Sequence, residues 1–76
     1  MANPKIAGIF ESVDDAERAR ERLLEAGVAL HRIVVSSERA HSRVRVITVA
    51  ARSEVDKDHI AELMKRSGAR DTVTPA

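Results

Sequence analysis

The chain has 76 residues, of which 13 are basic and 12 acidic, and its formal net charge is +1. This balance gives the composition no preference for nucleic acid or membrane partners, and we expect neither. The sequence contains no cysteine, which excludes a disulfide framework and a thiolate metal site within the chain. No stretch is apolar enough for a signal peptide or a membrane span, so we expect a cytoplasmic protein.

The length predicts one domain, residues 1–76, with a small core. A chain of this size buries only roughly 60% of its unfolded surface, and Phe10 is the only aromatic residue. The core must therefore be built from aliphatic side chains. Self-association is one way to bury more apolar surface, and a homodimer is the expected partner state.

The chain opens with a leader, residues 1–4, that Pro4 keeps extended. Lys5–Phe10, KIAGIF, then predicts a short strand with apolar residues on both faces, which is typical of a central position in a sheet. Gly8 interrupts this strand and marks the close approach of another part of the chain. We expect a crossing helix at that point.

Two stretches with the same outline predict the two helices. Ser12–Gly27, SVDDAERARERLLEAG, begins with an N-cap serine and ends with a glycine suited to the left-handed C-terminal position. Ser53–Gly68, SEVDKDHIAELMKRSG, repeats the pattern. Asp15 and Asp56 each follow the serine by three residues, where a carboxylate can close an acidic capping box.

Each predicted helix carries one stripe of small or apolar residues at three- and four-residue spacing, and this stripe should face the core. The stripe of the first helix consists of Val13, Ala16, Ala19, Leu23 and Ala26, and that of the second of Ile60, Leu63, Met64 and Ser67.

The rest of the chain predicts three more strands with short connections. Val28–Leu30 is expected to be a connection, Ile33–Ser36 a strand, Ser37–Ser42 a hairpin loop, Arg43–Ala51 the strongest strand, and Arg70–Thr74 a last short strand.

The resulting βαββαβ order predicts an α+β fold, a ferredoxin-like sandwich with an antiparallel-type sheet in the order 4-1-3-2 and both helices on one face. The central strands are apolar on both faces, so the face without helices is expected to need a cover. The predicted interface on that face consists of Ala7, Ile9, Ile47 and Val49, with the opposite parity formed by Ile6, Phe10, Val44 and Val46. The alternative is that small apolar side chains simply stay partly exposed there.

Residues that carry chemistry are sparse. His31, His41 and His59 do not have the spacing of a metal site, and we expect no metal and no cofactor. Ser36, Ser37 and His41 lack an orienting third group, and the glycine-rich phosphate loops are absent, so no catalytic residue is predicted. A lone Phe10 does not supply the stacked aromatics of an RNA-binding sheet.

Four arginines gather around the second and third strands: Arg32, Arg39, Arg43 and Arg45. Arg43 and Arg45 are expected to share a strand face, which could bind a small anion; the other predicted anion site is the N-terminus of the helix that starts at Ser12, where free N–H groups favour anions. The alternative is that these arginines protect an exposed sheet edge from pairing.

The segments IAGIFESVDDAERARERLLEAGV, IVVSS and RSGARD together resemble the bacterial general stress and heat-induced stress protein family. The resemblance implies a small α/β sandwich in a stress-associated bacterial protein, and it transfers no catalytic residue. A weaker similarity is to ACT-type ligand-sensing domains with the same element order. Those domains commonly use a glycine after the first strand, where this chain has Glu11 and Ser12.

The sequence therefore supports a leading hypothesis and two alternatives. The leading hypothesis is a non-enzymatic interaction module that dimerises through the open face of its sheet. The first alternative is a regulatory domain that binds a small anion or metabolite. The second, a small dimeric enzyme, lacks the buried polar cluster that it would need.

Overall fold

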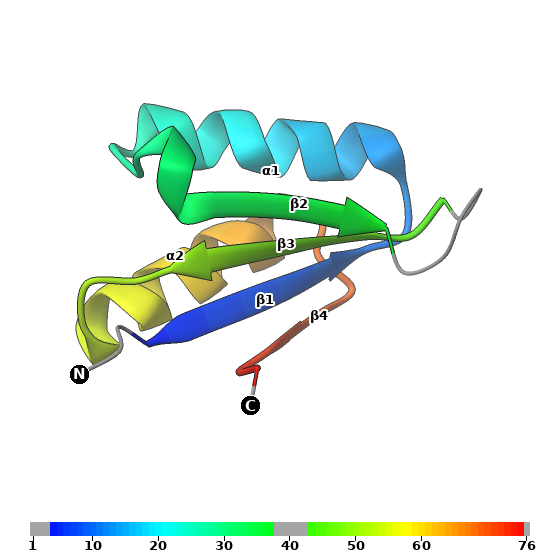
Figure 1. Ribbon diagram of the computed structural model, residues 1–76. Helices are drawn as coiled ribbons and strands as arrows, with labels where there is room; N and C mark the ends of the chain where they lie inside the picture. The colour runs from blue at the N-terminus through cyan, green and yellow to red at the C-terminus, as the bar shows by residue number, and fades with distance from the viewer. Residues whose placement is uncertain (1–3, 38–42, 76) are drawn as a thin grey trace.

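The computed structural model describes residues 4–37 and 43–75 (Figure 1). The predicted βαββαβ order is confirmed, and a short 3-10 helix, not predicted, precedes the second strand. The elements are β1 (Lys5–Phe10), α1 (Val13–Glu25), the 3-10 helix (Leu30–Arg32), β2 (Ile33–Ser37), β3 (Arg45–Ala50), α2 (Glu54–Arg66) and β4 (Asp71–Val73).

The four strands form one antiparallel sheet in the order β2-β3-β1-β4. This is the predicted order counted from the other edge. Both helices pack on the same face, because their buried residues join those of β1 and β3 in a single core cluster. In Figure 1 no described helix covers the face of the sheet that is turned to the viewer.

The ends of the two helices repeat each other in atomic detail. The Oγ atoms of Ser12 and Ser53 accept the backbone N–H three residues later, at 3.0 and 3.1 Å. Gly27 and Gly68 have φ angles of 94° and 105°, in the left-handed region that glycine adopts without a Cβ clash. The predicted serine and glycine boundaries are therefore confirmed in both helices.

The carboxylates in the first turns do not close the predicted capping boxes. Asp56 accepts the backbone N–H of Arg52 at 2.8 Å, one residue before the capping serine. Asp15 turns along the helix instead and forms an ion pair with Arg18 at 3.1 Å. In each case a nearby arginine offers the carboxylate a better placed donor than the N-cap backbone.

The stripe of α2 is buried up to its C-terminal end at Ser67, whereas the stripe of α1 is buried only in its central part. Ala16, Ala19 and Leu23 of α1 and Ile60 and Met64 of α2 are buried. The predicted members at the two ends of the first stripe, Val13 and Ala26, are exposed.

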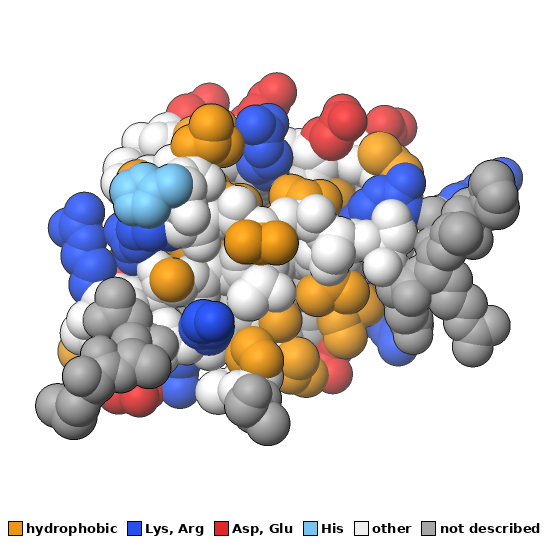
Figure 2. All heavy atoms as spheres, in the orientation of Figure 1, with side chains coloured by type: hydrophobic (Ala, Val, Ile, Leu, Met, Phe, Trp, Pro, Cys, Tyr) orange, Lys and Arg blue, Asp and Glu red, His pale blue; other side chains and the backbone are white. Residues whose placement is uncertain are grey.

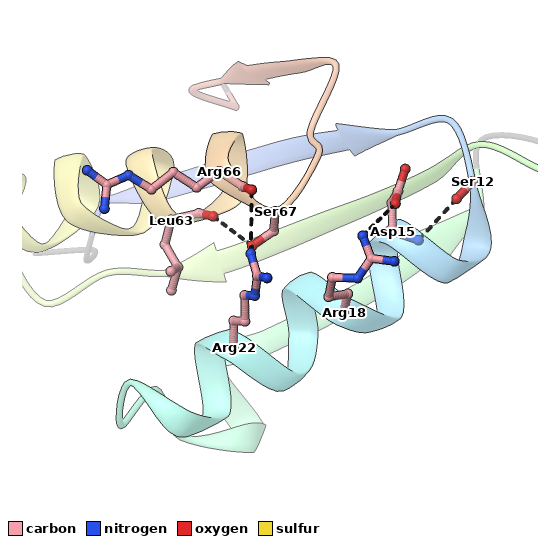
Figure 3. A network of polar contacts seen from close by, with 7 residues as sticks. All are labelled: Ser12, Asp15, Arg18, Arg22, Leu63, Arg66 and Ser67. Atoms are coloured by element: carbon pink, nitrogen blue, oxygen red, sulfur yellow. Dashed lines mark hydrogen bonds and ion pairs between the residues drawn. The ribbon is translucent and has the colours of Figure 1, made fainter.

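A buried serine links the helices. Ser67 is a buried polar residue at the end of α2, and its hydroxyl donates to the carbonyl oxygen of Leu63 at 2.8 Å. Figure 3 shows Arg22 of α1 reaching this point, where its Nη1 lies 3.4 Å from both Ser67 Oγ and the Arg66 carbonyl oxygen. The duplicated helices are thus joined near the C-terminal end of α2.

Gly8 confirms the expected close approach of a helix to β1. A Cβ atom at this position would lie 2.7 Å from Sδ of Met64, on α2. That separation is well inside van der Waals contact. The absence of a side chain at Gly8 therefore lets α2 pack directly on the central strand.

Candidate functional site

The open face of the sheet, which is the face without helices, is the main candidate site. Paired residues of an antiparallel sheet point to the same side, and side chains alternate along each strand. The register therefore assigns to the open face Lys5, Ala7 and Ile9 of β1, Val46, Thr48 and Ala50 of β3, Val34 and Ser36 of β2, and Asp71 and Val73 of β4. Figure 2 shows hydrophobic side chains across this face, with most charged side chains around its outline.

An uncharged row crosses all four strands. Val34 pairs with Thr48, Thr48 with Ala7, and Ala7 with Val73. The two valines at the ends of the row are well exposed, Val34 by 58% and Val73 by 42%. This face consequently presents apolar surface to the solvent at both of its edges.

Two of the four residues predicted for the interface lie on the helix-covered face of the sheet, so the prediction is wrong for them. Ile47 and Val49 were expected beside Ala7 and Ile9, but Val49 pairs with Ile6, and Ile47 with Gly8. Both are 0% exposed beneath the helices. Shifting the register by one residue exchanges the two faces of a strand, and strands that are apolar on both sides do not specify the register in their sequence.

The remaining two predicted interface residues do lie on the open face. Ala7 is buried there among its neighbours, and Ile9 is half-buried. Val46, which was expected on the opposite parity, pairs with Ile9 and shares its face. Val34 and Val73 were not predicted, because only the pairing of β2 and β4 shows where they point.

Two of the described strand residues that the register assigns to this face are charged. Lys5 and Asp71 are both exposed, and neither takes part in an ion pair within residues 4–37 and 43–75. Asp71 Oδ1 accepts the backbone N–H of Thr72 at 2.8 Å, which orients the carboxylate. The alternation of side chains along β1 is enough to predict that Lys5 lies on the same face as Ala7. The position of Asp71 on this face follows only from the pairing of β4 with β1.

The strand face that Arg43 and Arg45 were predicted to share does not form. Arg43 lies in a bend before β3, which begins at Arg45. Arg45 pairs with Phe10, so it lies on the side of the helices. The Ser12 hydroxyl is occupied by the first turn of α1, where two carboxylates, Asp14 and Asp15, disfavour an anion.

Arg32, which directly precedes the edge strand β2, contacts both β3 and α2. Its Nε donates to the Ala50 carbonyl oxygen at 2.7 Å, and its Nη2 forms an ion pair with Asp56 at 3.0 Å. The hydrogen bond from the Arg52 N–H and the Arg32 guanidinium lower the pKa of Asp56 despite its partial burial. Arg39 lies outside the described residues. Arg45 belongs to the inner strand β3 and pairs with Ser37 of the edge strand β2, and the edge-protection alternative stays a prediction.

Two clefts accompany the helices. A cleft of about 270 Å³ is lined by Ala26, Val28, Asp56, His59, Ile60 and Leu63. A smaller one, of about 100 Å³, is lined by Val13, Ala16, Glu17, Arg20, Val35 and Arg45. The larger cleft combines an apolar floor with one imidazole and one carboxylate, and this carboxylate already accepts two hydrogen bonds.

The histidines do not assemble a metal site in the described part of the chain. His31 is exposed on the 3-10 helix and His59 on α2, as expected for His59, while His41 falls outside the described residues. Among the residues that the structure describes, no three metal-ligating side chains come together.

Neither of the described helices is both long enough and apolar enough to cross a bilayer. No protein-family model matches the chain, and no curated protein or solved structure matches it significantly, so no enzyme family is indicated.

Proposed function

We propose that this chain is a non-enzymatic interaction module and that two copies associate face to face through their open sheets. The observation that carries the proposal is the uncharged row across that face, with Val34 58% and Val73 42% exposed at its ends. Together with the half-buried Ile9 and Val46, which pair with each other beside the row, the two valines form an apolar patch of the kind that marks a contact surface.

A second copy is the occupant that the charges favour. Lys5 and Asp71 carry opposite charges and lie on the same face. An identical face on a second copy therefore offers each of them a partner of opposite charge. Strands of three to six residues, about 3.4 Å long per residue and about 4.8 Å apart, give a contact of roughly 320 Å² per copy. This is less than half of the roughly 800 Å² per partner of a standard interface. We therefore expect a weak, concentration-dependent dimer with a dissociation constant in the micromolar range.

The βαββαβ order, the sheet order β2-β3-β1-β4 and the placement of both helices on one face support a ferredoxin-like sandwich. A dimerising module of this shape is compatible with the resemblance to the general stress protein family. On that resemblance we assign the chain a role in the stress response of a bacterium, and we separately place it in the cytoplasm.

Sedimentation equilibrium over a hundredfold concentration range tests the dimer. Detection uses interference or the far ultraviolet, since the chain has no Trp or Tyr. Val73→Glu puts a charge into the row and should weaken association at least tenfold. Val55→Glu is the matched control, because Val55 is a 68% exposed valine on α2, away from the open face. A wild-type chain that stays monomeric throughout the range refutes the proposal.

The second candidate function is a regulatory domain that binds a small metabolite, as in ACT-type domains. The cleft of about 270 Å³ favours it, because an apolar floor with His59 and Asp56 at its side is a common form of ligand site. A metabolite panel in thermal unfolding tests this candidate. A ligand at 100 times its dissociation constant adds about 2.7 kcal/mol, and His59→Ala should abolish the effect. The absence of a shift with every compound counts against it.

A further inference from the structure

We infer that the two copies are held in one register by two reciprocal ion pairs, each between Lys5 of one copy and Asp71 of the other. The inference rests on the proposed dimer and adds its symmetry axis, which passes between Ala7 and Val73. The inference is drawn from the pairing of β1 with β4 and from the exposure of Lys5 and Asp71.

The two charges lie on opposite sides of a central pair. Ala7 pairs with Val73, and Asp71 pairs with Ile9 on the antiparallel strand β4. Lys5 precedes Ala7 by two residues on β1, so it lies about 7 Å along the strand from the central pair, and Asp71 lies about 7 Å in the opposite direction. A point between Ala7 and Val73 is therefore midway between the ammonium-bearing and the carboxylate-bearing residues.

A half-turn about an axis through this midpoint, in the plane between two facing sheets, exchanges the positions of Lys5 and Asp71. Each ammonium then faces the carboxylate of the second copy, as an isologous interface requires. For strands about 4.8 Å apart, this axis makes the strands of the two sheets cross at about 40°. Aligned sheets in proteins pack with a crossing angle of about 30°, so the arrangement is compatible with ordinary sheet packing.

Simpler orientations leave the charges without partners. An axis parallel to the strands through the middle of the sheet places Lys5 over Ala50 of the second copy, since Lys5 pairs with Ala50 in its own sheet. An axis straight across the strands through Ala7 places Lys5 over Ile9 of the second copy. Both orientations desolvate an ammonium against an apolar side chain, which is unfavourable. Charge pairing thus selects one register among those that the apolar row allows.

The monomer leaves both charged groups available for this contact. Lys5 and Asp71 are exposed, and the ion pairs formed within the described ranges 4–37 and 43–75 use other residues. Near the axis, Ala7 faces Ala7 of the second copy, and its small side chain lets the two sheets approach. The interface therefore combines a thin apolar centre with a charge pair on each side.

Charge reversal and mixing test the register. Lys5→Glu alone opposes two carboxylates at each contact, and Asp71→Lys alone opposes two ammonium groups, so each variant should dimerise at least tenfold more weakly than the wild type. In an equimolar mixture both contacts become attractive, and association should return to within a few-fold of the wild type. The double variant Lys5→Glu/Asp71→Lys should likewise dimerise with itself.

Lys65→Glu, an exposed charge reversal on α2, is the matched control and should leave dimerisation unchanged. Far-ultraviolet circular dichroism of each variant verifies folding. If the wild type dimerises and Val73→Glu weakens it, but neither the mixture nor the double variant recovers, the open face is correct and the proposed register is wrong. If the wild type is monomeric, the proposed dimer itself fails. Recovery in both the mixture and the double variant supports the ion pairs.

Discussion

Replacing Gly8 by alanine tests how closely α2 packs on the central strand. The added methyl group would lie 2.7 Å from Met64 Sδ and 3.1 Å from Phe10 Cε1. Both of these side chains are fully buried, so neither can move away without disturbing the core. Gly8→Ala should therefore destabilise the fold even though alanine is the better residue for a strand.

The magnitude follows from two opposing terms. Overpacking a well-packed core costs about 1 to 3 kcal/mol. Replacing glycine inside a strand recovers about 0.5 to 1 kcal/mol of backbone entropy. We expect a net loss of about 1 to 2 kcal/mol, and each kcal/mol lowers the melting temperature of a domain of this size by about 4 to 8 °C.

Urea unfolding followed by circular dichroism at one fixed protein concentration measures this loss. A double-mutant cycle with Met64→Ala isolates its cause. Met64→Ala alone should cost about 2 to 5 kcal/mol, and in that background the Gly8→Ala methyl enters the vacated space and should be neutral or stabilising. A Gly8→Ala variant as stable as the wild type, or one equally damaging in both backgrounds, refutes the packing argument.

Two further predictions concern the helix ends. Because the folded-state pKa of Asp56 is lowered below its usual value of 3.8, the carboxylate stabilises the fold above that pH, and the contribution is lost as the pH falls through the folded-state pKa. Asp56→Asn should thus melt below the wild type at pH 7, with a gap that narrows below pH 3.8; a constant gap contradicts this. Gly68→Ala should destabilise more than Gly27→Ala in urea unfolding, since both have positive φ but only Gly68 has a neighbour, Asp15, at 3.3 Å from the added Cβ. Equal losses would show that this contact relaxes freely.

Local signals in the sequence predicted the elements well. The serine and glycine at the ends of each helix act through hydrogen bonds within four or five residues, so the spacing alone determines them. The strand order also followed, because two strand-helix-strand units have few ways to form one sheet. The 3-10 helix at Leu30–Arg32 was missed, since its sequence, LHR, carries no capping side chain.

Local signals in the sequence could not predict which side of each strand faces the helices. β1 has apolar residues at both parities, and so does β3, so any one-residue shift of their pairing preserves a plausible core. In the structure, Ile47 and Val49 lie with Ile6 against the helices, whereas Val46 and Thr48 face outward with Ile9 and Ala7. The charged residues of the proposed interface, Lys5 and Asp71, become neighbours of the same central pair only through this register.

The position of β1 has a consequence for how the chain folds. β2 and β3 are consecutive strands, so their pairing can form early, but Ala7 and Val73 come from opposite ends of the described chain and must meet across almost all of it. Such distant contacts raise the contact order and slow folding. During synthesis β1 emerges first and waits for β4, so the sheet is completed only when β4 has left the ribosome. Until then the outer edge of β1 stays unpaired, and this interval is when the chain is most exposed to aggregation.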